Sequence, residues 1–529
     1  MSLKKRQKIK INQYENHTIQ KDETIELIEI EPSGGEFFNE YIKIRKPCKF
    51  NFSILNSDCF KIDRIVNTLK YDEPLQVEKK INGGFGNGNS RIKMRFSELV
   101  DKIKGGNDEF YLTTQYDFDD PDVGDDINDE GTGNQNVSDE VLHDSEGEES
   151  IDLKNKNGSC ESEYEKGHVS DDEYDDSKED ETNLNELHRS ISHSEDEHED
   201  EDEDEHQEGG FESGFNNLSD TSSIDMNYLH DDYEEPDSES EIDINSRIKE
   251  LFQPPLTNLV HNPEILPLTP SFINLIPQQI NLWLGSCNNT NSNNTVLIDG
   301  TKSDLGLGKQ IPHGNSSGLH HDHADNLYIL ISGRKRFTIY SPNDALKLFT
   351  VGEIYRVYNS GVIDYKYDWK HVRDDGAIIE DVLRWMSDKE KDTSKKADLL
   401  QQLEEEIRRN ESNQTSNSTD PPSFSKIPPA LLHLDELKNP NLRKKLESFA
   451  NTHFPGFLNL NKCEILLNEG EMLYLPAGYF HEVSSFSDDD NSPHIAINYW
   501  FIPPNNNEFN KIYKDDYWKE DWDKTCMDL

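Results

Sequence analysis

The chain has 529 residues, 32% of them hydrophobic and 30% charged, and a formal net charge of −52. No stretch is long and apolar enough to cross a membrane, and the strong negative charge argues against direct binding to nucleic acid. The charge is uneven, because residues 117–245 hold 49 Asp or Glu against 5 Lys or Arg and the other 400 residues carry only −8. The acidity therefore belongs to one segment and not to the folded part of the chain.

The cysteines and the first residues indicate where the protein works. The six cysteines lack the CxxC spacing of zinc ribbons and form no regular disulfide pattern. The chain begins MSLKKRQKIK, which is basic and has no apolar core of a secretory signal. We therefore expect a cytoplasmic protein, with the nucleus as a second compartment because of this basic start.

Changes in composition predict five parts: a basic flexible N-terminus (1–24), the N-terminal part of the folded domain (25–116), an acidic disordered insertion (117–245), the main part of the domain (246–504) and a C-terminal tail (505–529). We expect two loop insertions in the main part, at about 286–316 and 387–425. Apolar spacing predicts helices at Phe37–Ile42, Met94–Ile103, Ile378–Met386, Ala397–Arg409 and Pro440–Phe454. It predicts strands at Glu109–Thr114 and Ile280–Gly285.

The acidic insertion is a low-complexity segment rich in Asp, Glu, Ser, Asn and Gly. Its most acidic stretch is EDEHEDEDEDEH, Glu195–His206. A segment with so few apolar residues cannot bury enough surface to offset the entropy of ordering the chain. We therefore expect the insertion to be disordered. The tract would attract a basic partner protein or simply keep the chain soluble.

A His-x-Asp motif, His320 and Asp322, stands at the head of the run SGLHHDHADNLYILISGRKRF. On a strand, residues two apart point to the same face, so this imidazole and this carboxylate can aim at one point. His321 and His323 are expected on the opposite face. A further histidine would complete a 2-His-1-carboxylate triad, which leaves positions open on Fe(II) in non-haem oxygenases.

The third ligand is expected from the second half of the chain. The stretch GEMLYLPAGYFHEV reads as a strand, a turn and a second strand that carries His481. Jelly-roll barrels bring early and late strands together, so the separation of His481 from Asp322 in the sequence is no obstacle. We therefore predict a metal site made by His320, Asp322 and His481.

These motifs resemble the JmjC branch of the Fe(II)/2-oxoglutarate oxygenases, and the likeness is nearest to members that are bifunctional peptidases and (3S)-lysyl hydroxylases. The segments that carry the resemblance, in the family's order, are FYLTTQ, INLWLG, SGLHHDHADNLYILISGRKRF, GEMLYLPAGYFHEV and IAINYWF. The resemblance implies a mainly β fold with flanking helices, the double-stranded β-helix or cupin-type jelly roll. It also implies Fe(II) and 2-oxoglutarate as cofactors.

The resemblance further assigns residues to the 2-oxoglutarate pocket. The lysine of the family's G-x-K motif binds the distal carboxylate, and Lys335 matches it; Ser332 and Gly333 predict a turn or bulge that resets the strand register before it. Arg334 and Arg336 are expected as solvated edge charges. The remaining contacts implied by the resemblance are Tyr111, Ser317, Asn326, Trp283, Tyr328, Asn498 and Trp500. For the aromatic residues, packing in the core is an equally good interpretation.

Three functions remain open from the sequence. The first is hydroxylation of a protein side chain, a lysine, with a translation-associated GTPase as the substrate that the resemblance suggests. The second is demethylation of lysine or arginine, against which the absence of a Cys/His-rich reader module counts. The third is a catalytically silent cupin scaffold that binds partners through its acidic tract. No zincin motif or nucleophilic triad supports a peptidase, and the sequence gives no oligomeric state.

Overall fold

The computed structural model describes residues 10–80, 84–85, 91–115, 244–287, 296–367, 370–411, 421–486 and 492–528. The predicted disordered insertion lies outside these ranges, except for its last two residues, with which a helix begins. None of the helices in the described ranges is long and apolar enough to span a membrane.

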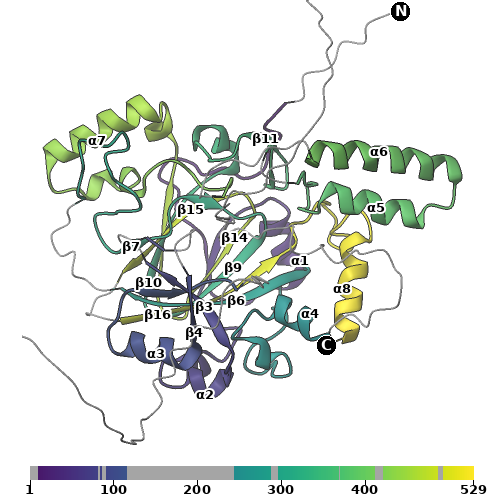
Figure 1. Ribbon diagram of the computed structural model, residues 1–529, viewed down its shortest axis with the longest axis horizontal. Coiled ribbons are helices and arrows are strands. Elements are labelled where there is room, and N and C mark those ends of the chain that lie inside the picture. The colour runs from purple at the N-terminus through teal and green to yellow at the C-terminus, as the bar shows by residue number, and fades with distance from the viewer. Residues whose placement is uncertain are drawn as a thin grey trace, which may run out of the picture. The chain divides into compact units, whose positions relative to one another are not determined.

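Two β-sheets make up the centre of the fold (Figure 1). In spatial order, the larger one contains β1 (Leu27–Ile28), β2 (Cys48–Phe50), β14 (Met472–Leu475), β9 (Asp325–Ser332), β16 (Ser492–Phe501), β6 (Pro277–Cys287), β5 (Phe110–Leu112), β3 (Pro74–Lys79) and β4 (Arg91–Arg95). The smaller one contains β13 (Cys463–Leu467), β10 (Arg334–Tyr340), β15 (Phe480–Phe486) and β7 (Asn315–Ser316), with β8 (His320–His321) also paired to β15. A separate hairpin joins β11 (Ile354–Val357) and β12 (Ile363–Tyr365).

The two sheets face each other across a buried core. Leu330 and Leu473 from the larger sheet pack in one cluster with Phe337 and Val483 from the smaller sheet. The chain alternates between the sheets, because β9, β14 and β16 belong to the larger and β10, β13 and β15 to the smaller. This is the double-stranded β-helix that the sequence predicts.

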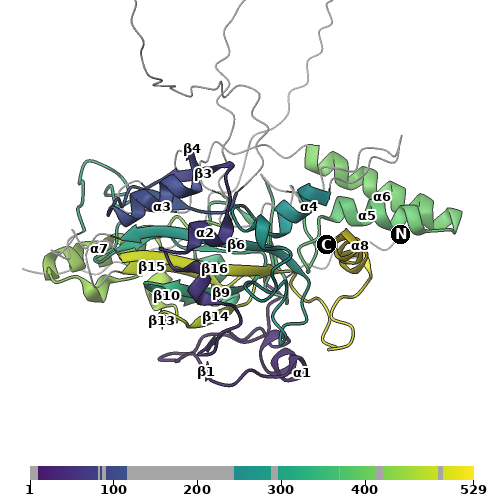
Figure 2. The same cartoon turned by 90° about the horizontal axis from the view of Figure 1, so that it is seen from below.

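Helices flank the sheets. The α-helices are α1 (Gly34–Phe37), α2 (Ile65–Leu69), α3 (Phe96–Lys104), α4 (Ile244–Leu251), α5 (Ile379–Lys389), α6 (Thr393–Glu411), α7 (Pro440–His453) and α8 (Tyr517–Asp528). A π-helix, η1 (Phe38–Ile42), continues α1, and short 3₁₀ helices lie at Ser57–Phe60, Thr257–Leu259, Pro342–Lys347, Pro429–Leu431, Leu434–Glu436 and Phe457–Asn459. Figure 2 shows β3, β4 and α3 at one end of the larger sheet and β1 at the other.

The local sequence explains these elements. In α3, Phe96, Leu99, Val100 and Ile103 recur at helical spacing, and all four are buried. The strand β13 alternates buried and exposed residues, as expected for a strand with one covered face. All five predicted helices occur, although α3 begins two residues later than predicted because Arg91–Arg95 pairs with β3.

The two ends of the chain differ from the prediction. Residues 10–24 were expected in a flexible N-terminus, yet Tyr14 and Ile19 are buried against the domain. Residues 505–529 were expected as a tail, yet α8 forms there and buries Tyr517 and Trp518. In both segments the buried apolar residues are few, and their burial depends on partners distant in the sequence.

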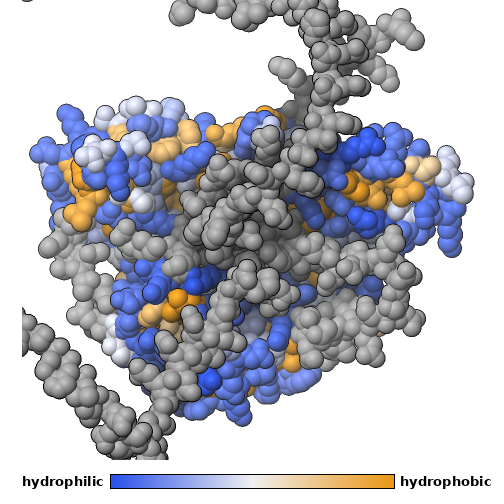
Figure 3. All heavy atoms as spheres, viewed as in Figure 1, coloured by the Kyte–Doolittle hydropathy of each residue, from blue (hydrophilic) through white to orange (hydrophobic). Residues whose placement is uncertain are grey.

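The predicted loop insertions also differ in part. Within 286–316, β6 extends to Cys287, and Val296 and Leu307 are buried in the main core. Within 387–425, α6 packs on α5 and buries Leu403. Hydrophobic side chains remain exposed on this helix pair, where Figure 3 shows an apolar stripe. These segments are therefore folded parts of the domain in the described ranges.

Candidate metal centre

Three predicted ligands converge at one end of the smaller sheet. His320 lies on β8, directly opposite His481 on β15, and Asp322 follows one residue after β8. One ligand atom from each of the three lies within 4.8 Å of the others. All three residues are buried, with at most 4% of the surface of each exposed. The strand pairing thus creates the grouping expected from the His-x-Asp spacing.

The backbone sets the tautomers of both histidines. His320 Nδ1 lies 3.0 Å from the carbonyl oxygen of Gly318, and His481 Nδ1 lies 3.0 Å from that of Tyr479. A carbonyl oxygen only accepts, so each Nδ1 carries the proton and each Nε2 keeps a free lone pair. Burial, and then neighbouring His481, lowers the pKa of His320 well below its usual value. His320 is therefore neutral, as a metal ligand must be.

Asp322 has an oxygen atom without a partner. Its Oδ2 accepts a hydrogen bond from Asn326 Nδ2 at 3.2 Å and lies 3.8 Å from His481 Nε2. Its Oδ1 is buried and has no hydrogen-bond partner among the described residues. Burial raises the pKa of this carboxyl group, and His481, Asn326 and Trp500 oppose the rise. A divalent cation fits this donor set, because it would satisfy the orphaned oxygen and both Nε2 atoms.

A buried ion pair fixes the turn that precedes His481. The carboxylate of Asp325 accepts hydrogen bonds from the backbone N–H of Ala477 at 3.0 Å and from Tyr474 Oη at 2.6 Å. Arg45, which is also buried, donates to the same carboxylate. The backbone N–H of Gly478 donates to the carbonyl oxygen of Asp322 at 2.9 Å. The turn is therefore tied to the segment between β8 and β9 that carries Asp322.

Phe424 was missed by the sequence reasoning. It lies at the end of the segment predicted as a loop insertion, yet its ring is stacked on that of His320 with centroids 4.8 Å apart and an interplanar angle of 10°. Phe424 is buried and holds one face of this ligand. No local pattern marks it, because a lone Phe within the polar sequence SFSK carries no periodicity.

A pocket opens beside the three ligands. It is lined by Phe85, Tyr111, Trp283, Ser317, His320, Asp322, Asn326, Tyr328, Phe337, His481, Val483, Asn498 and Trp500. Seven of these residues are the predicted contacts to 2-oxoglutarate other than Lys335. The structure therefore brings them all to the same pocket as the candidate ligands.

Three of the predicted contacts form a chain of hydrogen bonds that ends at Asp322. Trp283 Nε1 donates to Asn498 Oδ1 at 2.8 Å, and Asn498 Nδ2 donates to Asn326 Oδ1 at 3.1 Å. Asn326 in turn donates to Asp322. The chain of hydrogen bonds crosses from Trp283 on β6, through Asn498 on β16, to Asn326 on β9, and it orients the carboxylate of Asp322. Ser317 is similarly engaged, because its Oγ accepts from the backbone N–H of Val483 at 3.0 Å.

Lys335 lies farther along the barrel than the pocket lining. Its Nζ donates to Ser485 Oγ at 2.6 Å and lies 4.9 Å from the ring centroid of Phe85 and 5.5 Å from that of Tyr111. The predicted turn before it is present, since Gly333 has a φ of +88°. Burial, and then the charge of Lys80, lowers the pKa of Lys335 to about 7.

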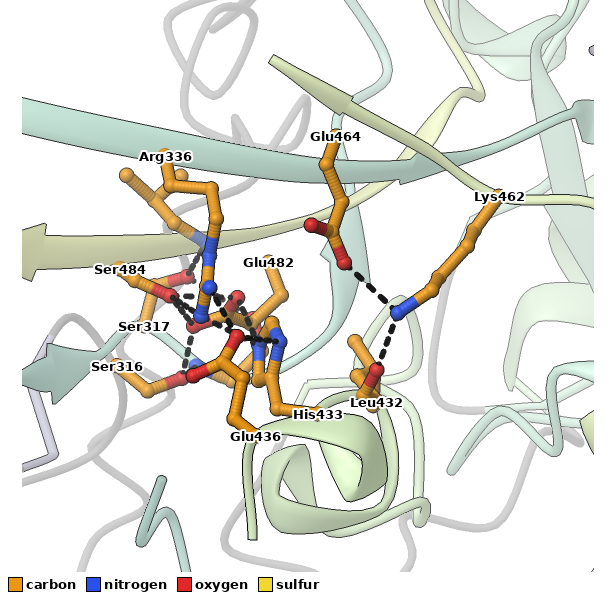
Figure 4. Close-up of polar contacts among 12 residues, drawn as sticks. Ser316, Ser317, Arg336, Leu432, His433, Glu436, Lys462, Glu464, Glu482 and Ser484 are labelled. Atoms are coloured by element: carbon orange, nitrogen blue, oxygen red, sulfur yellow. Dashed lines mark hydrogen bonds and ion pairs between the residues drawn. The ribbon is translucent and has the colours of Figure 1, made fainter. Parts of the chain in front are cut away.

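The residues beside Lys335 correct one expectation. Arg336 is not a solvated edge charge: its guanidinium contacts Glu436, His433 and Ser484 on the outer face of the smaller sheet (Figure 4). In the same cluster, buried Glu482 accepts a hydrogen bond from Ser316 Oγ at 2.6 Å and lies 3.1 Å from His433 Nε2. Glu482 and His481 occupy opposite faces of β15, so this cluster braces the strand from behind.

His321 and His323 point away from the candidate metal. His321 Nε2 lies 2.6 Å from Tyr365 Oη, and His323 Nε2 lies 3.1 Å from the carbonyl oxygen of Ile363. Both partners belong to β12, away from the pocket. This is the opposite face expected from strand alternation.

The barrel and its His-Asp-His cluster define a class of protein. The cupin-like domain family matches residues 35–507, most of the chain, so the chain belongs to that family. It is also similar to JmjC domain-containing protein 4 of Schizosaccharomyces pombe (strain 972 / ATCC 24843). The two are 29% identical over 356 residues, which cover 54% of this chain and 68% of the relative.

Proposed function

We propose that this protein is an Fe(II)- and 2-oxoglutarate-dependent oxygenase that hydroxylates a protein side chain. The observation that carries the proposal is the donor set of His320, Asp322 and His481. One ligand atom from each of the three lies within 4.8 Å of the others, both Nε2 atoms keep a lone pair, and one oxygen of the carboxylate is buried without a hydrogen-bond partner in the described part of the chain. A silent scaffold would leave that buried oxygen without compensation, which is costly. Family membership and the JmjC relative support the same class of chemistry.

Each site residue has a role in this proposal. His320, Asp322 and His481 would hold iron, and three protein ligands leave positions open for co-substrate and dioxygen. When bound, iron would let dioxygen oxidise both 2-oxoglutarate, to succinate and CO₂, and a substrate C–H bond, to C–OH. The aromatic walls of the pocket, Trp283 and Trp500 among them, would exclude water.

The proposed co-substrate also fits the charge of the pocket. Lys335 is buried and, among the described residues, has no carboxylate partner. A buried cation without a counter-ion is costly, and the distal carboxylate of 2-oxoglutarate would provide one. Lys335 would therefore bind that carboxylate while Asn326 and Asn498 hold Asp322 in place.

For the substrate we propose a lysine of an intracellular protein, with a translation-associated GTPase as the first candidate. Demethylation of lysine or arginine uses the same iron chemistry and remains the second candidate. The two reactions give different products, so mass spectrometry distinguishes them. Hydroxylation adds one oxygen atom to an unmodified lysine-rich GTPase peptide, whereas demethylation releases formaldehyde from a methylated peptide. A mass gain on the unmodified peptide supports our proposal; formaldehyde release without it would overturn the hydroxylase assignment.

A further inference from the structure

Three basic side chains gather behind the pocket, beyond the residues that line it. Lys335 comes from β10, Lys80 directly follows β3, and His494 lies on β16. The three are distant in the sequence and are brought together by the closing of the barrel. Lys335 and His494 are 1% and 2% exposed, and the Lys80 side chain is 5% exposed.

The ring of Tyr111 connects the two lysines. The Nζ atoms of Lys335 and Lys80 lie 5.5 Å and 5.9 Å from its centroid, within the range of cation–π contact. Lys80 also pairs with Asp108 and donates to the carbonyl oxygen of Ser286. Its position is therefore fixed, and its charge acts on Lys335 across the ring.

His494 has unsatisfied hydrogen-bonding capacity. Neither of its ring nitrogens has a hydrogen-bond partner among the described residues, although the side chain is almost fully buried. Its strand partner is Gly285, where a Cβ would collide with Tyr111 at 2.4 Å. At Gly333 a Cβ would lie 2.5 Å from His494 Nδ1. Two glycines therefore make room for the two rings.

The open hydrogen-bonding capacity of this region points to a ligand. Burial and the two lysines lower the pKa of His494 well below its usual value, so its ring is neutral and the positive charge comes from the lysines. The neighbouring carboxylates are already engaged, Asp108 by Lys80 and Glu482 by Ser316 and His433. The nearby thiol of Cys287 adds no charge, because burial raises its pKa to about 11. A buried ammonium group and an imidazole with no hydrogen-bond partner in the described part of the chain are the surroundings that a carboxylate ligand would complete.

We infer that Lys80 and His494 form, together with Lys335, the subsite for the distal carboxylate of the co-substrate and make the pocket select 2-oxo dicarboxylates over 2-oxo monocarboxylates. The inference rests on the proposed function. Lys335 contacts the carboxylate, His494 supplies a further N–H donor, and Lys80 is a positioning residue that raises the local positive potential. The two added groups extend the subsite beyond the single lysine of the G-x-K motif.

Binding to the Mn(II)-loaded full-length protein, measured by titration calorimetry, tests the inference. The ligands are 2-oxoglutarate and 2-oxovalerate, which has the same five-carbon chain without the distal carboxylate. In His494→Leu, which loses an N–H donor to the carboxylate, and in Lys80→Met, which loses a nearby positive charge, we expect the Kd for 2-oxoglutarate to rise about tenfold. The Kd for 2-oxovalerate should stay within about twofold. Lys79→Met, which changes the exposed neighbour on β3, should alter neither.

Other results would contradict the inference in distinct ways. If either variant weakens both ligands equally, that residue has only a structural role. If the affinity for 2-oxoglutarate is unchanged, that residue is not part of the subsite. If the wild-type protein binds neither ligand, the proposed function itself fails, whatever the variants do.

Discussion

Among single side chains, the carboxylate of Asp322 gains most from a bound cation, because one of its oxygen atoms is buried without a partner. We predict that Asp322→Ala abolishes stabilisation by Mn(II) and leaves the metal-free protein as stable as wild type or more so. In wild type, Mn(II) at 100 times the Kd should raise the free energy of unfolding by about 2.7 kcal/mol, seen as a rise in the thermal midpoint. His261→Gln, at an exposed histidine, should keep the rise. A metal-induced rise in Asp322→Ala would contradict the proposed ligand set.

The hydrogen-bond chain to Asp322 gives a second prediction. Asn498→Ala should leave Trp283 Nε1 and Asn326 Oδ1 without their partners, which costs about 1–3 kcal/mol of unfolding free energy. It should also raise the Kd for Mn(II) at least about tenfold, because Asn326 then holds the carboxylate less firmly. Urea denaturation and metal titration measure the two effects. Loss of stability with unchanged metal affinity would show that the chain does not orient Asp322.

Lys335 gives a prediction for pH. Burial lowers its pKa from 10.5 to about 7, so between these values the unfolded chain holds a proton that the folded protein has lost. Stability then rises with pH in this window, by at most about 1.4 kcal/mol per pH unit. Lys335→Met should lack this contribution. Urea denaturation at pH 7.5, 8.5 and 9.5 should show the free energy of unfolding of wild type rising relative to that of the variant. A difference that does not change with pH would contradict the lowered pKa.

The residues that the sequence predicted are those with a chemical pattern. The His-x-Asp spacing and the late His481 identify the candidate ligands, because strand alternation fixes which side chains share a face. Phe424 and Arg45 could not be predicted in the same way. Their contacts are set by the closing of the barrel, and nothing in the neighbouring sequence distinguishes them from ordinary loop or surface residues.

At the level of elements, the turn between β14 and β15 controls where His481 lies. Gly478 has a φ of +77°, and a Cβ there would lie 1.8 Å from the carbonyl oxygen of Gly361. Gly478→Ala should therefore displace the turn and abolish Mn(II) binding, with a loss of stability above about 3 kcal/mol. Gly470, in the turn before β14, has a φ of +86°, and a Cβ there would meet open space. Gly470→Ala should therefore lower the free energy of unfolding by only about 1–2 kcal/mol.

Metal titration and urea denaturation of both glycine variants test this distinction. Both variants place Ala at a positive φ, which is strained, but only Gly478 approaches another backbone closely. Equal effects in the two variants would show that the close approach to Gly361 does not position His481. Intact metal binding in Gly478→Ala would contradict the role of the turn.

The elements with strong periodicity were predictable and those without it were not. The amphipathic spacing of α3 and the apolar run of β9 correspond to observed elements. The helix α8 and the buried segment around Tyr14 have few apolar residues among many polar ones, and such a composition predicts tails. Their burial depends on contacts with the rest of the domain, which no window of sequence contains.

At the scale of the whole molecule, the charge separates into two parts. Residues outside 117–245 carry only −8, so the cupin-like domain has an ordinary charge for a folded protein, and the acidic segment holds nearly all of the excess. Behind the pocket, by contrast, the buried side chains of Lys335, Lys80 and His494 are all basic. The segment's composition supports a proposed basic partner, whereas the chemistry of the barrel depends on its own buried groups.

The central claim is that the His-Asp-His cluster supports turnover of 2-oxoglutarate. The most direct measurement is succinate formation by the purified full-length protein with Fe(II), ascorbate and dioxygen, with and without a lysine-rich GTPase peptide. We predict that wild type and His261→Gln form succinate, that the peptide stimulates it, and that His320→Ala abolishes it. Succinate formation by His320→Ala at the wild-type rate, or none by wild type that binds both iron and 2-oxoglutarate with any peptide, would contradict the claim.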